Sequence, residues 1–175
     1  MKSKLLPYRT LWLIAIGILV LDQATKLAIS DWLPLGTYSE YGPREPVEVI
    51  PGFFYLVHIV NKGAAWGIFA GHTEILGLLG LVAVGVIFCF RKALGLQRTF
   101  MQIIFGLLIG GILGNMIDRF AYGHVVDFFD FHFGTYRYPA FNIADCGITI
   151  GVGLYIIATL LEGKKAGKQP PASPE

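Results

Sequence analysis

The feature that most constrains the fold of this chain is a set of four long apolar runs. Each run approaches the roughly 20 residues with which a helix crosses the hydrocarbon core of a bilayer, and the runs cover residues 11–29, 75–90, 100–117 and 143–161. Of the 175 residues, 54% are hydrophobic and only 15% are charged, which excludes an ordinary water-soluble domain. The sequence therefore predicts a mainly α membrane protein built as a bundle of four transmembrane helices.

Basic residues predict the orientation of this bundle. They gather before the first run, between the second and third, and after the last: Lys2, Lys4, Arg9, Arg91, Lys92, Arg98, Lys164, Lys165 and Lys168. The positive-inside rule assigns all three places to the cytoplasm. We expect one membrane-embedded domain over residues 1–163 with an uncleaved first helix, both termini in the cytoplasm, and a disordered cytoplasmic tail over 164–175.

The first outer loop, residues 30–72, carries a strand pattern. Residues 46–50 and 53–60 are rich in β-branched and aromatic side chains and flank a Pro51–Gly52 turn. This pattern predicts a small outward-facing β hairpin or sheet on the bilayer surface. The aromatic residues of the loop suit the interface between lipid and water: Trp32, Tyr38, Tyr41, Phe53, Phe54, Tyr55, Trp66 and Phe69.

Two aspartates near the ends of the last connection are the strongest candidates for chemistry. Asp145 lies about one turn inside the last run without a cation in its own helix, and an ionisable residue in a membrane span marks a functional site by default. Asp127 alone could be a helix N-cap or a loop carboxylate, but the connection brings it toward Asp145. Two close carboxylates share one proton near neutral pH and can act as acid and base. The pair predicts a hydrolytic site at the outer membrane face.

Other polar residues are expected near this pair. Asn115 and Arg119 are one helical turn apart at the end of the third run, and Asn142 lies three residues before Asp145 on the same helix face. The same third run carries glycines at four-residue spacing, which predict close helix packing: Gly106, Gly110 and Gly114.

The remaining membrane charges have structural interpretations. Asp22 and Lys26 are four residues apart in the first run and are expected to form an ion pair, with support of the active centre as the alternative. Asp118 is expected to pair with Arg119 or with solvent, and Asp130 to lie in a loop. Neither is assigned a part in the chemistry.

Metal and nucleic-acid functions find no support in the sequence. The four histidines lack the short helical spacing of a zinc site: His58, His72, His124 and His132. The two cysteines, Cys89 and Cys146, are expected at opposite ends of their spans. The net charge of +2 comes from the membrane edges and the tail, where basic residues meet lipid headgroups.

Five short motifs, in order along residues 11–161, resemble those of bacterial lipoprotein signal peptidase, also called signal peptidase II. They are Asp22-Gln23-Ala24-Thr25-Lys26, Asn61-Lys62-Gly63-Ala64-Ala65-Trp66, Gly110 to Arg119, Val125-Val126-Asp127-Phe128 and Phe141-Asn142-Ile143-Ala144-Asp145. The resemblance implies an aspartic endopeptidase of the bacterial cytoplasmic (inner) membrane, which cuts the signal peptide from a prolipoprotein just before a diacylglyceryl-modified cysteine.

The resemblance also implies roles for individual residues. Asp127 and Asp145 match the catalytic pair, without assignment of which is acid and which is base. Six residues match the surrounding polar and motif positions: Asn61, Gly63, Asn115, Arg119, Asn142 and Asp22. It implies no metal or organic cofactor, lipid-modified prolipoprotein signal peptides and membrane lipids as partners, and a monomer whose site faces outward.

Two other classes of function remain open from the residues. A small transporter or proton pathway would use Asp22, Asn115 and Asp145 to line a polar route, although their gathering at one membrane face argues against it. A non-catalytic scaffold that binds lipid or lipoprotein would need the aromatic loop but not the aspartate pair.

Overall fold

The structure is a computed structural model that describes residues 8–37, 45–63, 69 and 71–166. It has four helices and a small sheet in the order α1, β1, β2, α2, α3, β3, β4, α4. Several sequence predictions lie outside the described part: those for Lys2, Lys4, Tyr38, Tyr41, Trp66, Lys168, the side chains of Lys164 and Lys165, and the tail from residue 167.

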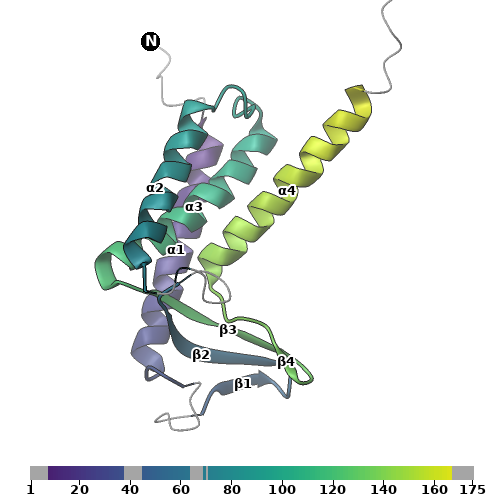
Figure 1. Cartoon of the computed structure of the whole chain (residues 1–175). Helices are drawn as coiled ribbons and strands as arrows, with labels where there is room; N and C mark the ends of the chain where they lie inside the picture. The colour runs from purple at the N-terminus through teal and green to yellow at the C-terminus, as the bar shows by residue number, and fades with distance from the viewer. Residues whose placement is uncertain (1–7, 38–44, 64–68, 70, 167–175) are drawn as a thin grey trace, which may run out of the picture.

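The helices form a bundle around α3. Its members are α1 (Arg9–Trp32), α2 (Thr73–Cys89), α3 (Thr99–Tyr122) and α4 (Ile143–Ala166), and α3 contacts the other three (Figure 1). By length and composition α1, α3 and α4 can each cross a membrane, whereas α2 is a shorter apolar helix of 17 residues. The predicted four-helix membrane architecture is confirmed.

The end of α3 differs from the prediction. The helix continues to Tyr122, five residues past the expected end at Ile117, and stops where Gly123 adopts a left-handed φ of 72° and donates its N–H to the carbonyl of Arg119. The helical position of Arg119, one turn after Asn115, is as predicted, and Asp118 is also helical because the polar last turn still packs against α1 and β3.

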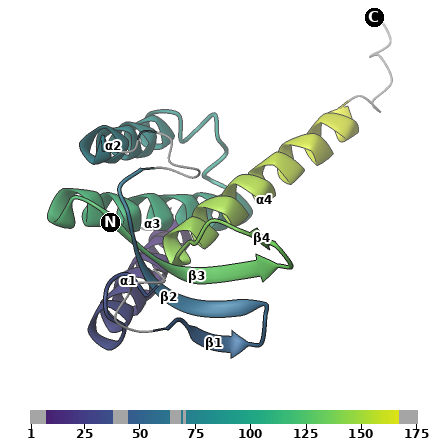
Figure 2. The same ribbon diagram turned by 60° about the horizontal axis from the view of Figure 1, so that its bottom comes forward.

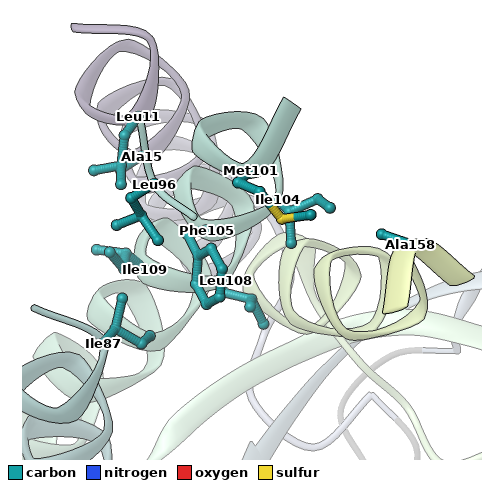
Figure 3. Packing of buried hydrophobic residues seen from close by; sticks show 10 residues of the cluster. All are labelled: Leu11, Ala15, Ile87, Leu96, Met101, Ile104, Phe105, Leu108, Ile109 and Ala158. Atoms are coloured by element: carbon teal, nitrogen blue, oxygen red, sulfur yellow. The ribbon is translucent and has the colours of Figure 1, made fainter. Parts of the chain in front are cut away.

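Glycines allow the close approach of the helices, as the spacing predicted. A Cβ on Gly110 would lie 2.6 Å from the carbonyl oxygen of Ala15 in α1, and one on Gly106 would lie 2.8 Å from that of Leu11. At the end of the bundle away from the sheet, apolar side chains from all four helices and the α2–α3 connection pack around α3 (Figure 3). Asn115, Asp118 and Arg119 lie at the other end of α3, beside the sheet.

The sheet is antiparallel with the strand order β1-β2-β3-β4 (Figure 2). Its strands are β1 (Val47–Ile50), β2 (Phe54–Asn61), β3 (Val125–Phe133) and β4 (Tyr136–Arg137). The predicted hairpin of the first outer loop is present, but placing the sheet in that loop alone was wrong. Its other two strands come from the connection between α3 and α4, which was interpreted as a loop.

Pairing of β2 with β3 positions the first aspartate. Ile59 is the partner of Asp127 in the register, and Asn61 is the partner of Val125. Val126 and Phe128, on either side of Asp127, are buried in a cluster with Ile29 and Leu33 at the end of α1. Because side chains alternate along a strand, burial of these two neighbours turns Asp127 to the opposite face of β3.

Candidate active site

Asp127 is a buried carboxylate held by two amides. Its side chain is only 2% exposed, and its two oxygens accept hydrogen bonds from Asn142 Nδ2 (2.7 Å) and Asn61 Nδ2 (2.9 Å). Burial raises the pKa of Asp127 to about 7, and the nearby Asp145 carboxylate also raises it. The hydrogen bonds from the two amides and the positive charge of Lys26 lower this pKa, but by less. A carboxyl with a pKa near 7 is suited to general acid–base chemistry at neutral pH.

Asp145 is fixed by the start of its own helix. Asn142 precedes the first residue of α4, and its Oδ1 accepts a hydrogen bond from the backbone N–H of Asp145 (3.0 Å). In return, Asp145 Oδ2 accepts one from the backbone N–H of Asn142 (3.2 Å). This reciprocal arrangement is a capping box, and the positive end of the helix dipole favours a carboxylate in the first turn. The predicted shared face of Asn142 and Asp145 is confirmed.

Two asparagines connect the aspartate pair, Asp127 and Asp145. Asn115 Nδ2 donates to Asp145 Oδ1 (2.8 Å), while Asn115 Oδ1 accepts from Asn142 Nδ2 (3.2 Å). The Nδ2 of Asn142 also donates to Asp127. The hydrogen bonds thus form a chain from β3 through the start of α4 and through α3 back to Asp145.

Arg119 connects α3 to the end of β2. Its Nη1 donates to the backbone carbonyl of Asn115 and its Nη2 to that of Gly63, each at 3.2 Å. The Gly63 N–H donates to Asn61 Oδ1 (2.9 Å), so the same amide that holds Asp127 is itself oriented. The structure therefore brings Asn61, Gly63 and Arg119 to the aspartate pair.

Asp22 reaches the site from α1. The predicted ion pair with Lys26 is confirmed, with 2.8 Å between Lys26 Nζ and Asp22 Oδ2. Asp22 Oδ1 also accepts a hydrogen bond from the backbone N–H of Ala144 (2.9 Å), one residue before Asp145. Asp22 thus has both the ion pair and a contact with the active-site end of α4.

Two predictions about the remaining acids were wrong. Asp118 does not pair with Arg119 or solvent: it is buried, and its Oδ2 lies 2.7 Å from Lys26 Nζ. Its position three residues after Asn115 on one face of α3 was the signal, but the expected helix end at residue 117 concealed it. Asp130 lies in β3 and not in a loop, buried beside His132 with 2.7 Å between Oδ2 and Nε2.

The described residues contain no group of three or more His, Cys, Asp or Glu side chains that could hold a metal ion.

Comparison with known proteins identifies the family. The family model described as "Signal peptidase (SPase) II" matches residues 14–161. The chain is 40% identical over 154 residues to the lipoprotein signal peptidase of Desulforapulum autotrophicum, covering 83% of this chain and 88% of that protein. It is 39% identical to the lipoprotein signal peptidase of Staphylococcus carnosus, covering 87% and 91%. This chain belongs to the signal peptidase II family.

Solved structures agree with this membership in the signal peptidase II family. A bacterial membrane enzyme solved at 2.3 Å superposes with a TM-score of 0.79 at 35% identity, covering 95% of each chain. A second one, solved at 1.9 Å, gives 0.73 at 37% identity, covering 87% of this chain and 93% of that one. The chain is thus a membrane-embedded signal peptidase, a class of hydrolase. Its candidate site combines two carboxylates with several amides and one guanidinium.

Proposed function

We propose that this chain is an aspartic endopeptidase that removes signal peptides from prolipoproteins, cutting just before the diacylglyceryl-modified cysteine. Family membership supports the substrate class. The observation that carries the mechanism is Asp127, a buried carboxyl with a pKa of about 7, linked to Asp145 by amide hydrogen bonds. Near neutral pH the pair retains one proton, whose apparent pKa belongs to both groups.

The shared proton gives the pair its two roles. The ionised aspartate removes a proton from a water molecule as the water oxygen attacks the scissile carbonyl carbon. The protonated aspartate donates a hydrogen bond to the carbonyl oxygen as negative charge develops there. The tetrahedral intermediate then breaks its C–N bond, the leaving amine takes a proton from the pair, and the carboxylic acid product departs.

The surrounding residues keep the reacting groups in register. Asn142 and Asn61 supply the two N–H groups that hold Asp127, and Asn115 supplies one to Asp145. Misplacement of reacting groups by an ångström can lower the rate on the order of 10²-fold. Arg119 and Gly63 connect the end of β2 to α3, and Asp22 holds the start of α4, so these three residues act through the backbone.

The position of the site fits a substrate that arrives in the membrane. Asp127 lies in β3 and Asp145 in the first turn of α4, and these two elements meet where the helix bundle joins the sheet (Figure 1). We assign this end to the outer face of the bacterial cytoplasmic membrane. A signal-peptide helix would enter from the lipid between spans, with its acyl chains remaining in the bilayer. The chain would act as a monomer without metal or organic cofactor, in contact with membrane lipids.

The test is cleavage of a diacylglyceryl-modified prolipoprotein peptide in detergent. Wild type is expected to cut before the lipidated cysteine, whereas Asp127→Asn and Asp145→Asn are expected to lose turnover while remaining folded in a thermal unfolding assay. Asp130→Asn is the matched control, because Asp130 is a buried carboxylate in the same strand as Asp127 but makes its contact with His132. It is expected to retain activity.

The outcomes separate the three classes of function. An inert wild type would overturn the peptidase assignment and favour a transporter or a binding scaffold. Normal cleavage by either folded variant of the aspartate pair would show that the reaction does not use these carboxylates.

A further inference from the structure

A buried lysine lies near the aspartate pair, and within the described part of the chain its ion pairs and hydrogen bond go to other groups. The Lys26 side chain is 4% exposed and lies between two carboxylates, with its Nζ 2.8 Å from Asp22 Oδ2 and 2.7 Å from Asp118 Oδ2. The same Nζ donates to Asn115 Oδ1 at 2.9 Å. The proposed reaction assigns no part to Lys26 or Asp118.

We propose that Lys26, held by Asp22 and Asp118, is a positioning residue that fixes the orientation of the Asn115 amide. The inference rests on the proposed function, because the amide matters only if Asp145 takes part in the reaction. Lys26 itself does not touch the substrate in this scheme.

The argument starts from the two different ends of an amide. Asn115 has an oxygen that only accepts and a nitrogen that only donates, and an ammonium group only donates. With Lys26 Nζ on one side, the oxygen of Asn115 must face the lysine, which leaves the nitrogen facing Asp145 Oδ1. If the Asn115 amide were flipped, its nitrogen would face the Lys26 ammonium and its oxygen would face the Asp145 carboxylate, and both hydrogen bonds would be lost.

The same choice propagates to the other aspartate. Asn115 Oδ1 also accepts from Asn142 Nδ2, and that nitrogen donates to Asp127 Oδ1. Asn142 Oδ1 is in turn directed to the backbone N–H of Asp145. The ammonium therefore acts directly on the Asn115 amide and, through Asn115 Oδ1, favours the direction of the Asn142 amide, whose nitrogen also donates to the carbonyl oxygen of Val126 (3.3 Å).

The two carboxylates explain why the lysine does not bind the pair directly. An ammonium has three N–H groups, and three oxygens from Asp22, Asp118 and Asn115 surround Nζ at the distances above. Gln23 Nε2 contacts both carboxylates, at 2.8 Å from Asp118 Oδ1 and 3.2 Å from Asp22 Oδ2, and so holds their positions. The positive charge remains close to the pair while its N–H groups are directed elsewhere.

The test requires charge-balanced variants. Removing Lys26 alone would leave two buried carboxylates with no cation between them, a change that is strongly destabilising. Lys26→Met/Asp118→Asn removes one positive and one negative charge, and Asn at position 118 keeps an oxygen for Gln23. Lys26→Gln/Asp118→Asn has the same charge and a similar size but restores an N–H donor toward Asn115.

The two variants are compared by kcat and KM on the lipidated peptide. The Met variant is expected to lower kcat on the order of 10²-fold, with KM within about threefold of wild type because substrate contacts are unchanged. The Gln variant is expected to turn over about five- to tenfold faster than the Met variant, the worth of one neutral hydrogen bond. Thr25→Ala is the control, because Thr25 Oγ1 donates to the backbone carbonyls of Leu21 and Asp22 in its own helix, and it is expected to keep wild-type kcat.

Three results would overturn the proposal. The first two are a wild-type kcat in the Met variant and an equal kcat in the Met and Gln variants. The third is a charge-balanced variant that does not fold, because Lys26 would then be a structural residue. The proposed function has separate markers. If wild type does not cut, or Asp145→Asn cuts normally, the peptidase mechanism fails. If these two behave as expected and only the Lys26 comparison fails, the positioning role alone is wrong.

Discussion

Substitution of Asp127 by Asn should stabilise the folded protein at alkaline pH while abolishing cleavage. Asp127 is buried, and burial raises its pKa from the ordinary aspartate value of 3.8 to about 7. Above pH 7 the folded wild type must therefore keep an ionised carboxyl in a place that disfavours it. Asn has nearly the same shape and no charge, so the variant is free of this cost.

The pH dependence follows from proton binding. Between about pH 4 and 7 the unfolded chain has lost the Asp127 proton while the folded protein still holds it, so the folded state binds more protons and its stability falls as pH rises through this window. Each pKa unit corresponds to about 1.4 kcal/mol. From about pH 4.5 to pH 8 the stability of Asp127→Asn relative to wild type should thus rise by about 3 kcal/mol. Any constant loss from the hydrogen bonds of Asn61 and Asn142 cancels in this difference.

The measurement is thermal unfolding of both proteins in the same detergent across this pH range. For a chain of this length, about 3 kcal/mol corresponds to roughly 6 to 12 °C in the difference between the two Tm values. The acid end of the series is the control, because there both proteins are neutral at position 127 when folded. A Tm difference that stays constant with pH would refute the reasoning, since Asp127 would then ionise equally in the folded and unfolded states.

Three further outcomes are expected. For wild type, kcat/KM should fall as pH rises above about 7, because the aspartate pair loses its shared proton; a rate that keeps rising to pH 9 would contradict this. Asn142→Ala should lower kcat on the order of 10²-fold and remove a helix cap worth about 1 kcal/mol, measured as kcat and Tm. Gly111→Ala should lower both kcat and Tm, because the new Cβ would clash with the Ala144 carbonyl oxygen. Such overpacking costs about 1–3 kcal/mol of stability. Gly153→Ala, which meets nothing within 4 Å, should change neither; equal behaviour of the two glycine variants would exclude steric displacement of α4.

The sequence was sufficient for the helices and for the residues around the aspartate pair. Apolar runs of span length have few alternatives, because a lipid-facing backbone must satisfy its own hydrogen bonds. An acid such as Asp145 inside such a run indicates a functional site by default. Asn115 and Asn142 were found by helix periodicity, since Asn142 and Asp145 share a face whatever the tertiary structure is, whereas Asn61 was found only by the family resemblance.

The sequence was insufficient where long-range pairing decides the structure. β3 pairs with β2, which lies more than sixty residues earlier in the chain. No local pattern in Val125–Phe133 indicates which strand it pairs with. The burial of Asp118 depends in the same way on Lys26, a residue of another helix. A charge near a predicted span end is usually solvated, and only the packing of α1 against α3 shows that this one is not.

The start of α4 is the point at which these separate constraints meet. Asp22 of α1 accepts the Ala144 N–H, and Gly111 of α3 lies under the carbonyl of the same residue. A Cβ on Gly114 would lie 2.5 Å from Asp22 Oδ2. Gly114 belongs to the same row of α3 glycines as Gly106 and Gly110, so the row that lets α1 and α3 pack closely also leaves space for the carboxylate that holds α4. Positioning of Asp145 is therefore a consequence of bundle packing, whereas positioning of Asp127 is a consequence of sheet pairing. The amides of Asn115 and Asn142 link these two parts of the site by hydrogen bonds between side chains. A second route runs through Arg119, Gly63 and Asn61. Because the two amides contact the carboxylates themselves, we expect changes in their orientation to affect turnover more than folding.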